Sequence, residues 1–178
     1  MTATTKPTLD EFLSLEETKP YREYVCGEVT QKPMPNWDHS AIQAFLAAIL
    51  FPFLAQAGSG RVLTEFRCIF GGRAYVPDLS YVAKERLTGD RYLRSAPDLA
   101  IEVLSPDQDM GRFLEKIQAY LRYGVRLVWV IDPVRATVTV LMPGEDARVL
   151  TAGDVLDGGD VLPGFTLAID EIFAQTRV

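Results

Sequence analysis

The chain of 178 residues is 48% hydrophobic and 24% charged, and its formal net charge is −6. These values are ordinary for a globular protein and are consistent with one domain over residues 1–178. The negative charge excludes attraction of the whole protein to nucleic acid, so a polyanionic partner would need a local basic patch.

The N-terminal third predicts a short helix followed by a hairpin. Thr8 and, three residues later, Glu11 form the pattern of a capping box that begins a helix. Residues 21–33 are typical of two short strands around a turn at Gly27.

A long helix is predicted next, because apolar residues recur at helical spacing between residues 36 and 58. Asn36 or Asp38 can cap its beginning, Gly58 ends it, and Pro52 can kink or shorten it. The alternation in residues 61–71 then predicts one half-exposed strand, with Val62, Cys68 and Phe70 on a common face.

The segment from residue 98 to residue 132 has the pattern strand–helix–strand. Its two apolar strands are typical of strands buried on both faces, and Gly124 ends the helix between them. We expect a right-handed crossover that makes the two strands parallel neighbours. Residues 136–152 predict an antiparallel edge pair, so the expected fold is a single α/β domain with a mixed sheet.

Glu102 lies inside one of these buried strands, three residues before Ser105. Burying an unpaired charge destabilises the fold by roughly several kcal/mol. This carboxylate therefore needs a partner, a metal or an exposed position. Asp78 lies in the preceding strand segment, so the two acids can face one point if the strands are adjacent. Two carboxylates repel unless a proton or cation intervenes, and Mg²⁺ is the hard cation that fits oxygen ligands best.

Two further side chains are candidates for the same site, each with a plain alternative. Lys116 can direct its ammonium at the metal site and stabilise a developing negative charge, or it can be a surface lysine beside an apolar stripe. Glu28, on the early hairpin, can be a catalytic acid or a solvated edge-strand residue.

Four segments carry a resemblance to a known family: VPD at 76–78, PDLAIEVLSPDQD at 97–109, EKIQAYLRYGVRLVWVIDP at 115–133 and GDVLPGF at 159–165. Together they closely resemble the Uma-type family, a large bacterial family described as putative restriction endonucleases within the PD-(D/E)XK nuclease superfamily. The resemblance covers nearly the whole chain. It implies a restriction-endonuclease-like core, in which helices flank a central mixed β-sheet.

The resemblance also implies roles for the candidate residues. Asp78 matches the first acidic position of the superfamily, Glu102 matches the acid of the (D/E)XK element, and Glu28 is similar to an extra acid found in many of these nucleases. Leu104 stands where the pattern has lysine, and Lys116 resembles a relocated motif lysine. The implied metal ligands are Asp78, Glu102 and the carbonyl of Val103, which would hold Mg²⁺, with Mn²⁺ as a substitute.

The implied activity is metal-dependent hydrolysis of phosphodiester bonds in DNA by a homodimer, whose symmetry supplies the second strand cut. RNA is an alternative substrate. An inactive nuclease-fold module that binds nucleic acid or protein is the alternative function, favoured by Leu104 and the acidic composition, and an unrelated α/β enzyme is a third. The basic loop between the two acidic strands is the candidate phosphate-binding patch, and it contains Lys84, Arg86, Arg91, Tyr92 and Arg94.

Several other polar residues favour structural roles. His39 is expected to be a helix cap or surface residue, with substrate contact as the alternative. Ser105 is expected to cap a helix and not to act as a nucleophile, because no histidine pairs with it in the sequence pattern. Asp109 is expected in the first turn of a helix, and Asp132 in a turn.

The two cysteines and the apolar segments bear on the cellular environment. Cys26 and Cys68 lie in strand-like segments and are expected to be reduced core residues. Residues 44–55 form the longest apolar stretch, which is too short to cross a bilayer and is interrupted by Pro52. With no secretory signal pattern at the N-terminus, we expect a cytoplasmic protein without membrane contact.

Overall fold

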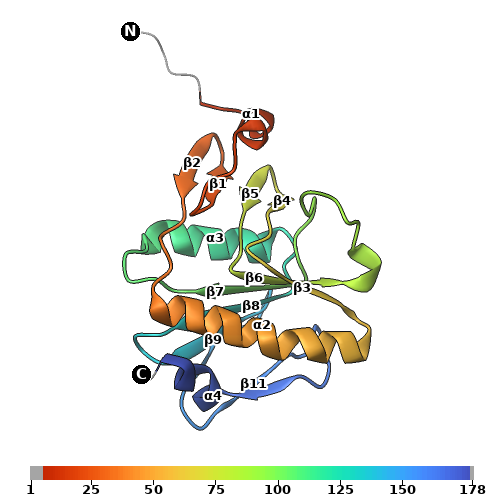
Figure 1. Ribbon diagram of the computed structural model, residues 1–178, viewed down its shortest axis with the longest axis vertical. Helices are drawn as coiled ribbons and strands as arrows, with labels where there is room; N and C mark the ends of the chain where they lie inside the picture. The colour runs from red at the N-terminus through yellow and green to blue at the C-terminus, as the bar shows by residue number, and fades with distance from the viewer. Residues whose placement is uncertain (1–5, 177–178) are drawn as a thin grey trace.

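The computed structural model describes residues 6–176 and shows a layered α/β arrangement (Figure 1). The helices are α1 (Leu9–Ser14), α2 (Trp37–Ala57), α3 (Met110–Arg122) and α4 (Ile169–Phe173), with short 3₁₀ turns at Lys84–Arg86 and Ala174–Thr176. The strands are β1 (Arg22–Val25), β2 (Glu28–Gln31), β3 (Gly60–Thr64), β4 (Cys68–Phe70), β5 (Arg73–Tyr75), β6 (Leu79–Ala83), β7 (Leu99–Val103), β8 (Leu127–Asp132), β9 (Thr137–Leu141), β10 (Arg148–Leu150), β11 (Val155–Asp157) and β12 (Thr166–Ala168).

A six-stranded mixed sheet forms the centre of the molecule, in the order β10-β9-β8-β7-β6-β3. Only β7 and β8 are parallel neighbours in it, and α3 is the crossover between them. The predicted crossover unit and the predicted antiparallel edge formed by β9 and β10 are therefore confirmed. β6 lies beside β7, with Leu79 opposite Ile101, so the two acidic segments are neighbours in the sheet.

The two faces of this sheet carry separate hydrophobic clusters. Ile101 and Val103 of β7 belong to the cluster formed with α2, whereas Ala100 belongs to the cluster formed with α3. Because side chains alternate along a strand, Glu102 points to the α3 face. Figure 1 shows α2 and α3 on opposite sides of the sheet.

A four-stranded sheet, β2-β1-β5-β4, covers one end of the α3 side. The prediction of a single strand over residues 61–71 is wrong. The two halves of this stretch belong to different sheets, because β3 pairs with β6 and β4 pairs with β5. The chain turns between them at Glu65, whose φ of 48° is left-handed and whose backbone N–H donates to the Asp78 carbonyl.

Helix ends follow the predicted signals closely. Thr8 and Glu11 form a capping box at α1, Asn36 caps α2, and Gly58 ends α2 in the left-handed conformation. By length and composition alone, α2 is long and apolar enough to cross a membrane. The prediction that this apolar stretch is too short to do so is therefore wrong. In the fold, however, the helix continues through Pro52 and packs a row of leucine and isoleucine side chains on the sheet.

Candidate active site

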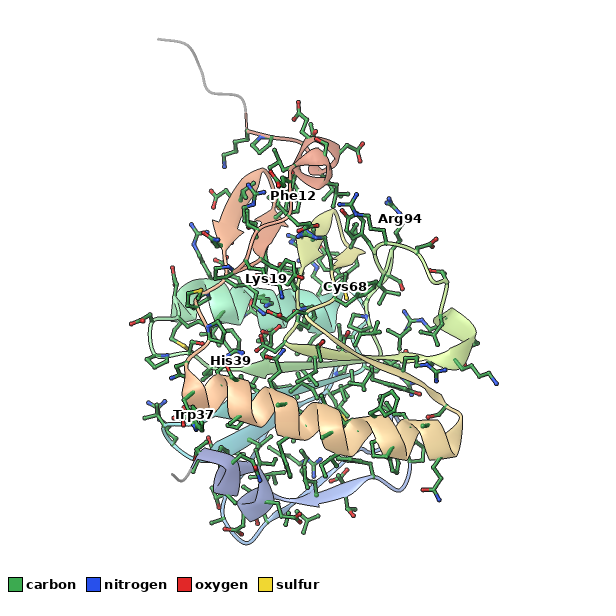
Figure 2. The ribbon with its side chains drawn as sticks, viewed as in Figure 1. Phe12, Lys19, Trp37, His39, Cys68 and Arg94 are labelled. Atoms are coloured by element: carbon green, nitrogen blue, oxygen red, sulfur yellow. The ribbon has the colours of Figure 1, made fainter. Side chains whose placement is uncertain are left out.

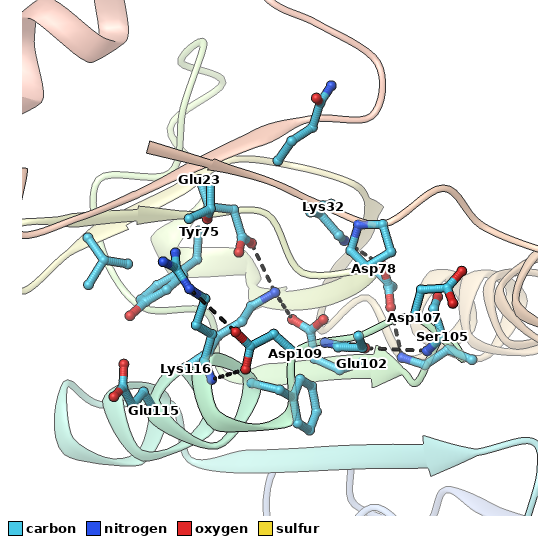
Figure 3. A pocket seen from close by; sticks show the side chains of 18 of the residues that line it. Glu23, Lys32, Tyr75, Asp78, Glu102, Ser105, Asp107, Asp109, Glu115 and Lys116 are labelled. Carbon is cyan, nitrogen blue, oxygen red and sulfur yellow. Dashed lines mark hydrogen bonds and ion pairs between the residues drawn. The ribbon is translucent and has the colours of Figure 1, made fainter. Parts of the chain in front are cut away.

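A cavity of about 710 Å³ opens between the β1–β2 hairpin, the segment after β2, and the beginning of α3 (Figure 3). Asp78, Glu102 and Lys116 all line it, so the structure brings three of the predicted site residues together. Each of these three side chains is less than one tenth exposed.

Glu102 is fastened to α3 by two contacts on a single oxygen. Its Oε1 atom lies 2.8 Å from Lys116 Nζ and accepts a hydrogen bond of 2.7 Å from the hydroxyl of Tyr120. Lys116 and Tyr120 are four residues apart and therefore lie on one face of the helix. Burial raises the pKa of Glu102, although the ammonium of Lys116 opposes that shift.

Lys116 bridges two carboxylates, since its Nζ also lies 2.9 Å from Glu23 Oε1. Glu23 comes from β1 and accepts a further hydrogen bond of 2.8 Å from the backbone N–H of Val76. Burial opposes the charge on Lys116, but the attraction of Glu102 and Glu23 exceeds that effect and raises its pKa. The lysine is thus held protonated between two acids, and the alternative of a surface lysine is wrong.

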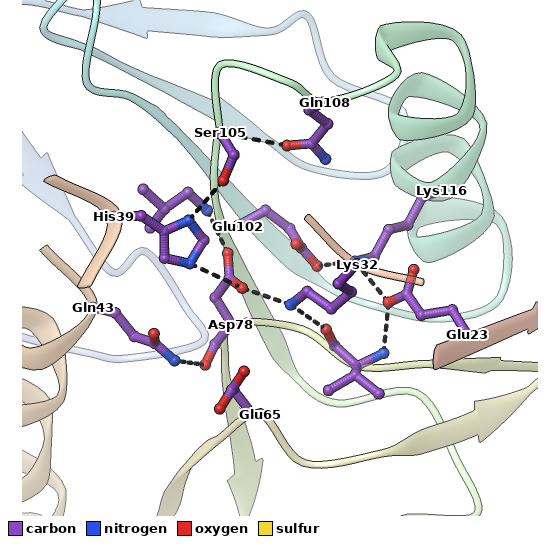
Figure 4. A network of polar contacts seen from close by, with 12 residues as sticks. Glu23, Lys32, His39, Gln43, Glu65, Asp78, Glu102, Ser105, Gln108 and Lys116 are labelled. Carbon is purple, nitrogen blue, oxygen red and sulfur yellow. Dashed lines mark hydrogen bonds and ion pairs between the residues drawn. The ribbon is translucent and has the colours of Figure 1, made fainter. Parts of the chain in front are cut away.

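Asp78 is surrounded by donors from three different elements (Figure 4). Its Oδ1 atom lies 2.6 Å from Lys32 Nζ and 3.3 Å from His39 Nε2, and its Oδ2 atom accepts a 2.7 Å hydrogen bond from the backbone N–H of Val103. Burial would raise the pKa of Asp78, but Lys32 and His39 outweigh it and hold the pKa well below its usual value. The bond to Val103 fastens Asp78 directly to the residue that follows Glu102.

His39 is buried, so its predicted place at the surface is wrong. Its Nδ1 atom lies 3.2 Å from Ser105 Oγ while Nε2 faces Asp78, and a histidine therefore does pair with Ser105. The two ring nitrogens face the serine and the acid in the opposite order to a serine hydrolase triad. The chain of contacts orients Asp78, and it does not form a nucleophile of that type.

Glu28 lies outside this buried network. Its side chain is 53% exposed at the rim of the cavity and pairs with Lys6 at 3.3 Å and Arg112 at 3.5 Å. Glu23, on the paired strand, is the acid that reaches Lys116.

The predicted phosphate-binding loop lies away from the cavity. None of its five candidates, Lys84, Arg86, Arg91, Tyr92 and Arg94, lines the cavity. Figure 2 shows Arg94 and His39 on well-separated parts of the molecule. Arg86 forms an ion pair of 2.7 Å with buried Asp98, so its role is structural. Arg91, Tyr92 and Arg94 instead surround a shallow depression beside α1.

Asp109 and Asp132 have structural roles, although Asp109 precedes the first turn of α3, where it was expected. Asp109 caps α3 by accepting hydrogen bonds from the N–H groups of Gly111 and Arg112, and Asp132 accepts from the turn that follows β8. Cys68 is buried, and burial raises the pKa of its thiol to about 12. Cys26 is exposed at the hairpin turn, so its expected place in the core is wrong.

The sequence pattern missed Glu23, Lys32 and Tyr120. Tyr120 lies at a position of the apolar stripe of α3, where its ring does pack, and its hydroxyl group was the missed signal. Lys32 carries no local signal, since it reaches Asp78 across 46 residues of sequence.

A family model described as "Putative restriction endonuclease", named Uma2, matches residues 9–170. The chain belongs to the Uma2 family. The crystal structure of a putative nuclease belonging to DUF820 from Anabaena variabilis ATCC 29413 is similar over 96% of this chain and 99% of that one, with a TM-score of 0.90 and 33% identity. No curated protein matches the chain. The Uma2 fold is thus a mixed sheet flanked by helices, as the family resemblance implied.

Leu104 explains how this Uma2 chain departs from the motif of the superfamily. Leu104 is the first residue after β7, two residues beyond Glu102, and it packs against the cluster on the α3 face. The ammonium group that meets Glu102 in this structure comes from Lys116 of α3.

Proposed function

We propose that this Uma2 protein is a metal-dependent nuclease that hydrolyses phosphodiester bonds of DNA. The observation that carries the proposal is the convergence of Asp78 and Glu102 through Val103, with Lys116 on Glu102. Family membership and the similar crystal structure support a nuclease. The metal is inferred from the carboxylates of the cavity, and the DNA substrate from the family resemblance.

The donor atoms of the cavity fit a hard divalent cation such as Mg²⁺. Carboxylate oxygens of Asp78 and Glu102, with the carbonyl of Val103 as a further candidate, are the ligand type that Mg²⁺ prefers, and Mn²⁺ accepts the same set. A bound ion of this kind would supply a water of lowered pKa and neutralise charge on the phosphate.

The protein residues then have separate tasks. Lys116 keeps Glu102 in place and puts a positive charge where negative charge develops during hydrolysis. Glu23 and Tyr120 hold Lys116 and Glu102 from behind, which restricts both side chains to one orientation.

The charge of the cavity lining favours a cation as part of the site. Acids outnumber bases there, and the acids are Glu23, Glu28, Asp78, Glu102, Asp107, Asp109 and Glu115, against Lys32, Arg112 and Lys116. An acidic wall repels a phosphodiester, so neutralisation by bound cations would assist binding of a nucleic acid.

An inactive binding module is the second candidate, motivated by Leu104 and the acidic charge. The buried ammonium of Lys116 beside Glu102 weighs against it, because burying three carboxylates and two lysines is costly for a surface that only binds a partner. A homodimer remains part of the proposal, since two sites would cut two strands.

Cleavage assays test the proposal directly. Single-stranded, double-stranded and branched DNAs, with RNA as a parallel substrate, are incubated with the protein and Mg²⁺ or Mn²⁺. We expect cation-dependent cleavage of DNA that Glu102→Gln lowers by more than about 100-fold, since partners behind metal ligands alone are often worth 10- to 100-fold. Glu145→Gln, at an exposed position outside the cavity lining, is the matched control and should keep activity within a few-fold, roughly.

Circular dichroism shows whether each variant remains folded. Equal cleavage by the parent protein and Glu102→Gln, or no cleavage of any substrate with either cation, would contradict the proposal and favour the binding module.

A further inference from the structure

Asp78 has little coordination capacity left in this structure. A carboxylate offers about four acceptor sites. Three are engaged by Lys32 Nζ at 2.6 Å, His39 Nε2 at 3.3 Å and the N–H of Val103 at 2.7 Å. A cation that binds through Oδ1 must therefore take the place of one of two donors.

Two of the three donors to Asp78 are rigidly held. Val103 belongs to β7 in the middle of the six-stranded sheet, and its N–H is part of the backbone. His39 lies in the first turn of α2, where its own N–H donates to Asn36 Oδ1 and its ring contacts Ser105. Neither can leave without disturbing a buried element.

Lys32 is held differently. It follows β2 at the start of a segment of irregular structure, residues 32–36, that contains Pro33 and Pro35 and leads to α2. Apart from Asp78, its ammonium contacts one neutral group, the carbonyl of Val76 at 2.8 Å. The side chain is 11% exposed and lines the cavity, so a change of its own torsion angles would take the ammonium toward solvent.

Lys116 offers the contrast within the same site. It lies in the middle of α3 and is clasped by two carboxylates, Glu23 and Glu102. If the ammonium of Lys116 moved away, two buried carboxylates would lose their cation. If the ammonium of Lys32 moved away, only Asp78 would lose its cation, and a bound metal ion would replace it.

Charge balance favours exchange over addition. The buried network holds three carboxylates, Glu23, Asp78 and Glu102, against the ammonium groups of Lys32 and Lys116. A divalent cation added beside both lysines would change the net charge of these five groups from −1 to +1, and the ammonium of Lys32 on Asp78 would repel it at close range. If Lys32 leaves as the cation enters, the charges of the cation and of Lys116 balance those of the three carboxylates.

We propose that Lys32 is a resident counterion of Asp78 which a divalent cation displaces on binding, so that Lys32 sets the metal affinity of the site. The proposal rests on the proposed function, because it concerns the same cation. It assigns Lys32 a positioning role: the ammonium stabilises Asp78 in the absence of metal and turns toward the mouth of the cavity when metal is bound.

Acetylation of the unaltered protein tests the displacement without any variant. Sulfosuccinimidyl acetate is applied with and without Mg²⁺, and peptide mass spectrometry reports each lysine. We expect Lys32 to be protected without the cation and acetylated with it. Lys84, which is exposed, should react equally in both conditions, and Lys116 should stay protected in both. Protection of Lys32 in the presence of saturating Mg²⁺ would overturn the proposal.

Calorimetric titration with Mn²⁺ tests the effect on affinity. In Lys32→Met, which keeps the length of the side chain without its charge, the apparent Kd should fall by about tenfold or more, because a competing like charge is gone. Lys84→Met controls for the change in net charge and should leave the Kd unchanged. Unchanged affinity in Lys32→Met would contradict the exchange.

The outcomes separate this inference from the proposed function. If the unaltered protein binds Mn²⁺ while Lys32→Met behaves identically and Lys32 stays protected, only the exchange fails. If neither protein binds Mn²⁺, both the exchange and the metal-dependent function are contradicted.

Discussion

Glu102 shows what a buried strand requires of a charged residue. It stands between Ile101 and Val103, both in the core, and is itself 2% exposed. Removing one partner of a buried ion pair commonly costs about 3–5 kcal/mol. The contacts with Lys116 and Tyr120 therefore stabilise the fold around this carboxylate.

Asp78 predicts a dependence of stability on acid pH. Its folded pKa is depressed because Lys32 and His39 outweigh the effect of burial, so the unfolded chain binds the proton more readily. The stability that this carboxylate contributes is thus present above its unfolded pKa, about 3.9, and is lost as pH falls through the folded value.

The measurement is urea unfolding of the parent protein and Asp78→Asn from about pH 7 down to about pH 2. We expect the variant to be less stable at neutral pH, and the difference in unfolding free energy to shrink as pH is lowered. Asp10→Asn, at an exposed position of α1, is the surface control. A difference that stays constant over this range would contradict the argument.

At the scale of elements, the beginning of α2 links helix stability to the site. Asn36 accepts a 2.9 Å hydrogen bond from the N–H of His39, which is the residue that faces Asp78. The cap therefore satisfies a free N–H of the first turn and positions His39 at the same time.

We predict that Asn36→Ala lowers the unfolding free energy by about 1 kcal/mol, the usual cost of losing such a cap. Asn36→Asp should preserve stability, because aspartate accepts the same bond and favours the positive end of the helix dipole. Chemical denaturation measures both variants. Equal stability of Asn36→Ala and the parent would mean that the cap contributes nothing.

At the scale of the whole molecule, one sheet joins the two hydrophobic clusters. β7 and β8 contribute alternate residues to both, such as Ile101 and Trp129 on the α2 face and Ala100 and Val128 on the α3 face. Loss of either cluster removes the support of the same strands, so the two faces are expected to unfold together.

We therefore predict a single cooperative thermal transition, with calorimetric and van't Hoff enthalpies that agree. Tryptophan fluorescence, which includes buried Trp129, should give the same midpoint as far-ultraviolet circular dichroism. Two resolved transitions, or different midpoints for the two probes, would show that residues 1–178 are not one folding unit.

The sequence by itself determined the features that depend on local chemistry. The capping box at Thr8, a cap of α2 at Asn36 or Asp38, the end of α2 at Gly58 and the parallel pair β7–β8 were predicted, because caps and hydrophobic periodicity act over a few residues. The need of Glu102 for a partner was equally evident, since the cost of burying a charge does not depend on the fold.

Only the tertiary structure decided which partners meet. Lys32 reaches Asp78 from the segment after β2, and Glu23 reaches Lys116 from β1. Both contacts join residues far apart in the sequence, and no local pattern marks either one. The turn at Glu65 divides a stretch that alternates regularly, and its two halves find their strand partners in different sheets, β6 for β3 and β5 for β4. Long-range pairing of backbone and charge thus brought Asp78, Glu102 and Lys116 together, as the sequence proposed, and added Glu23 and Lys32, which it did not.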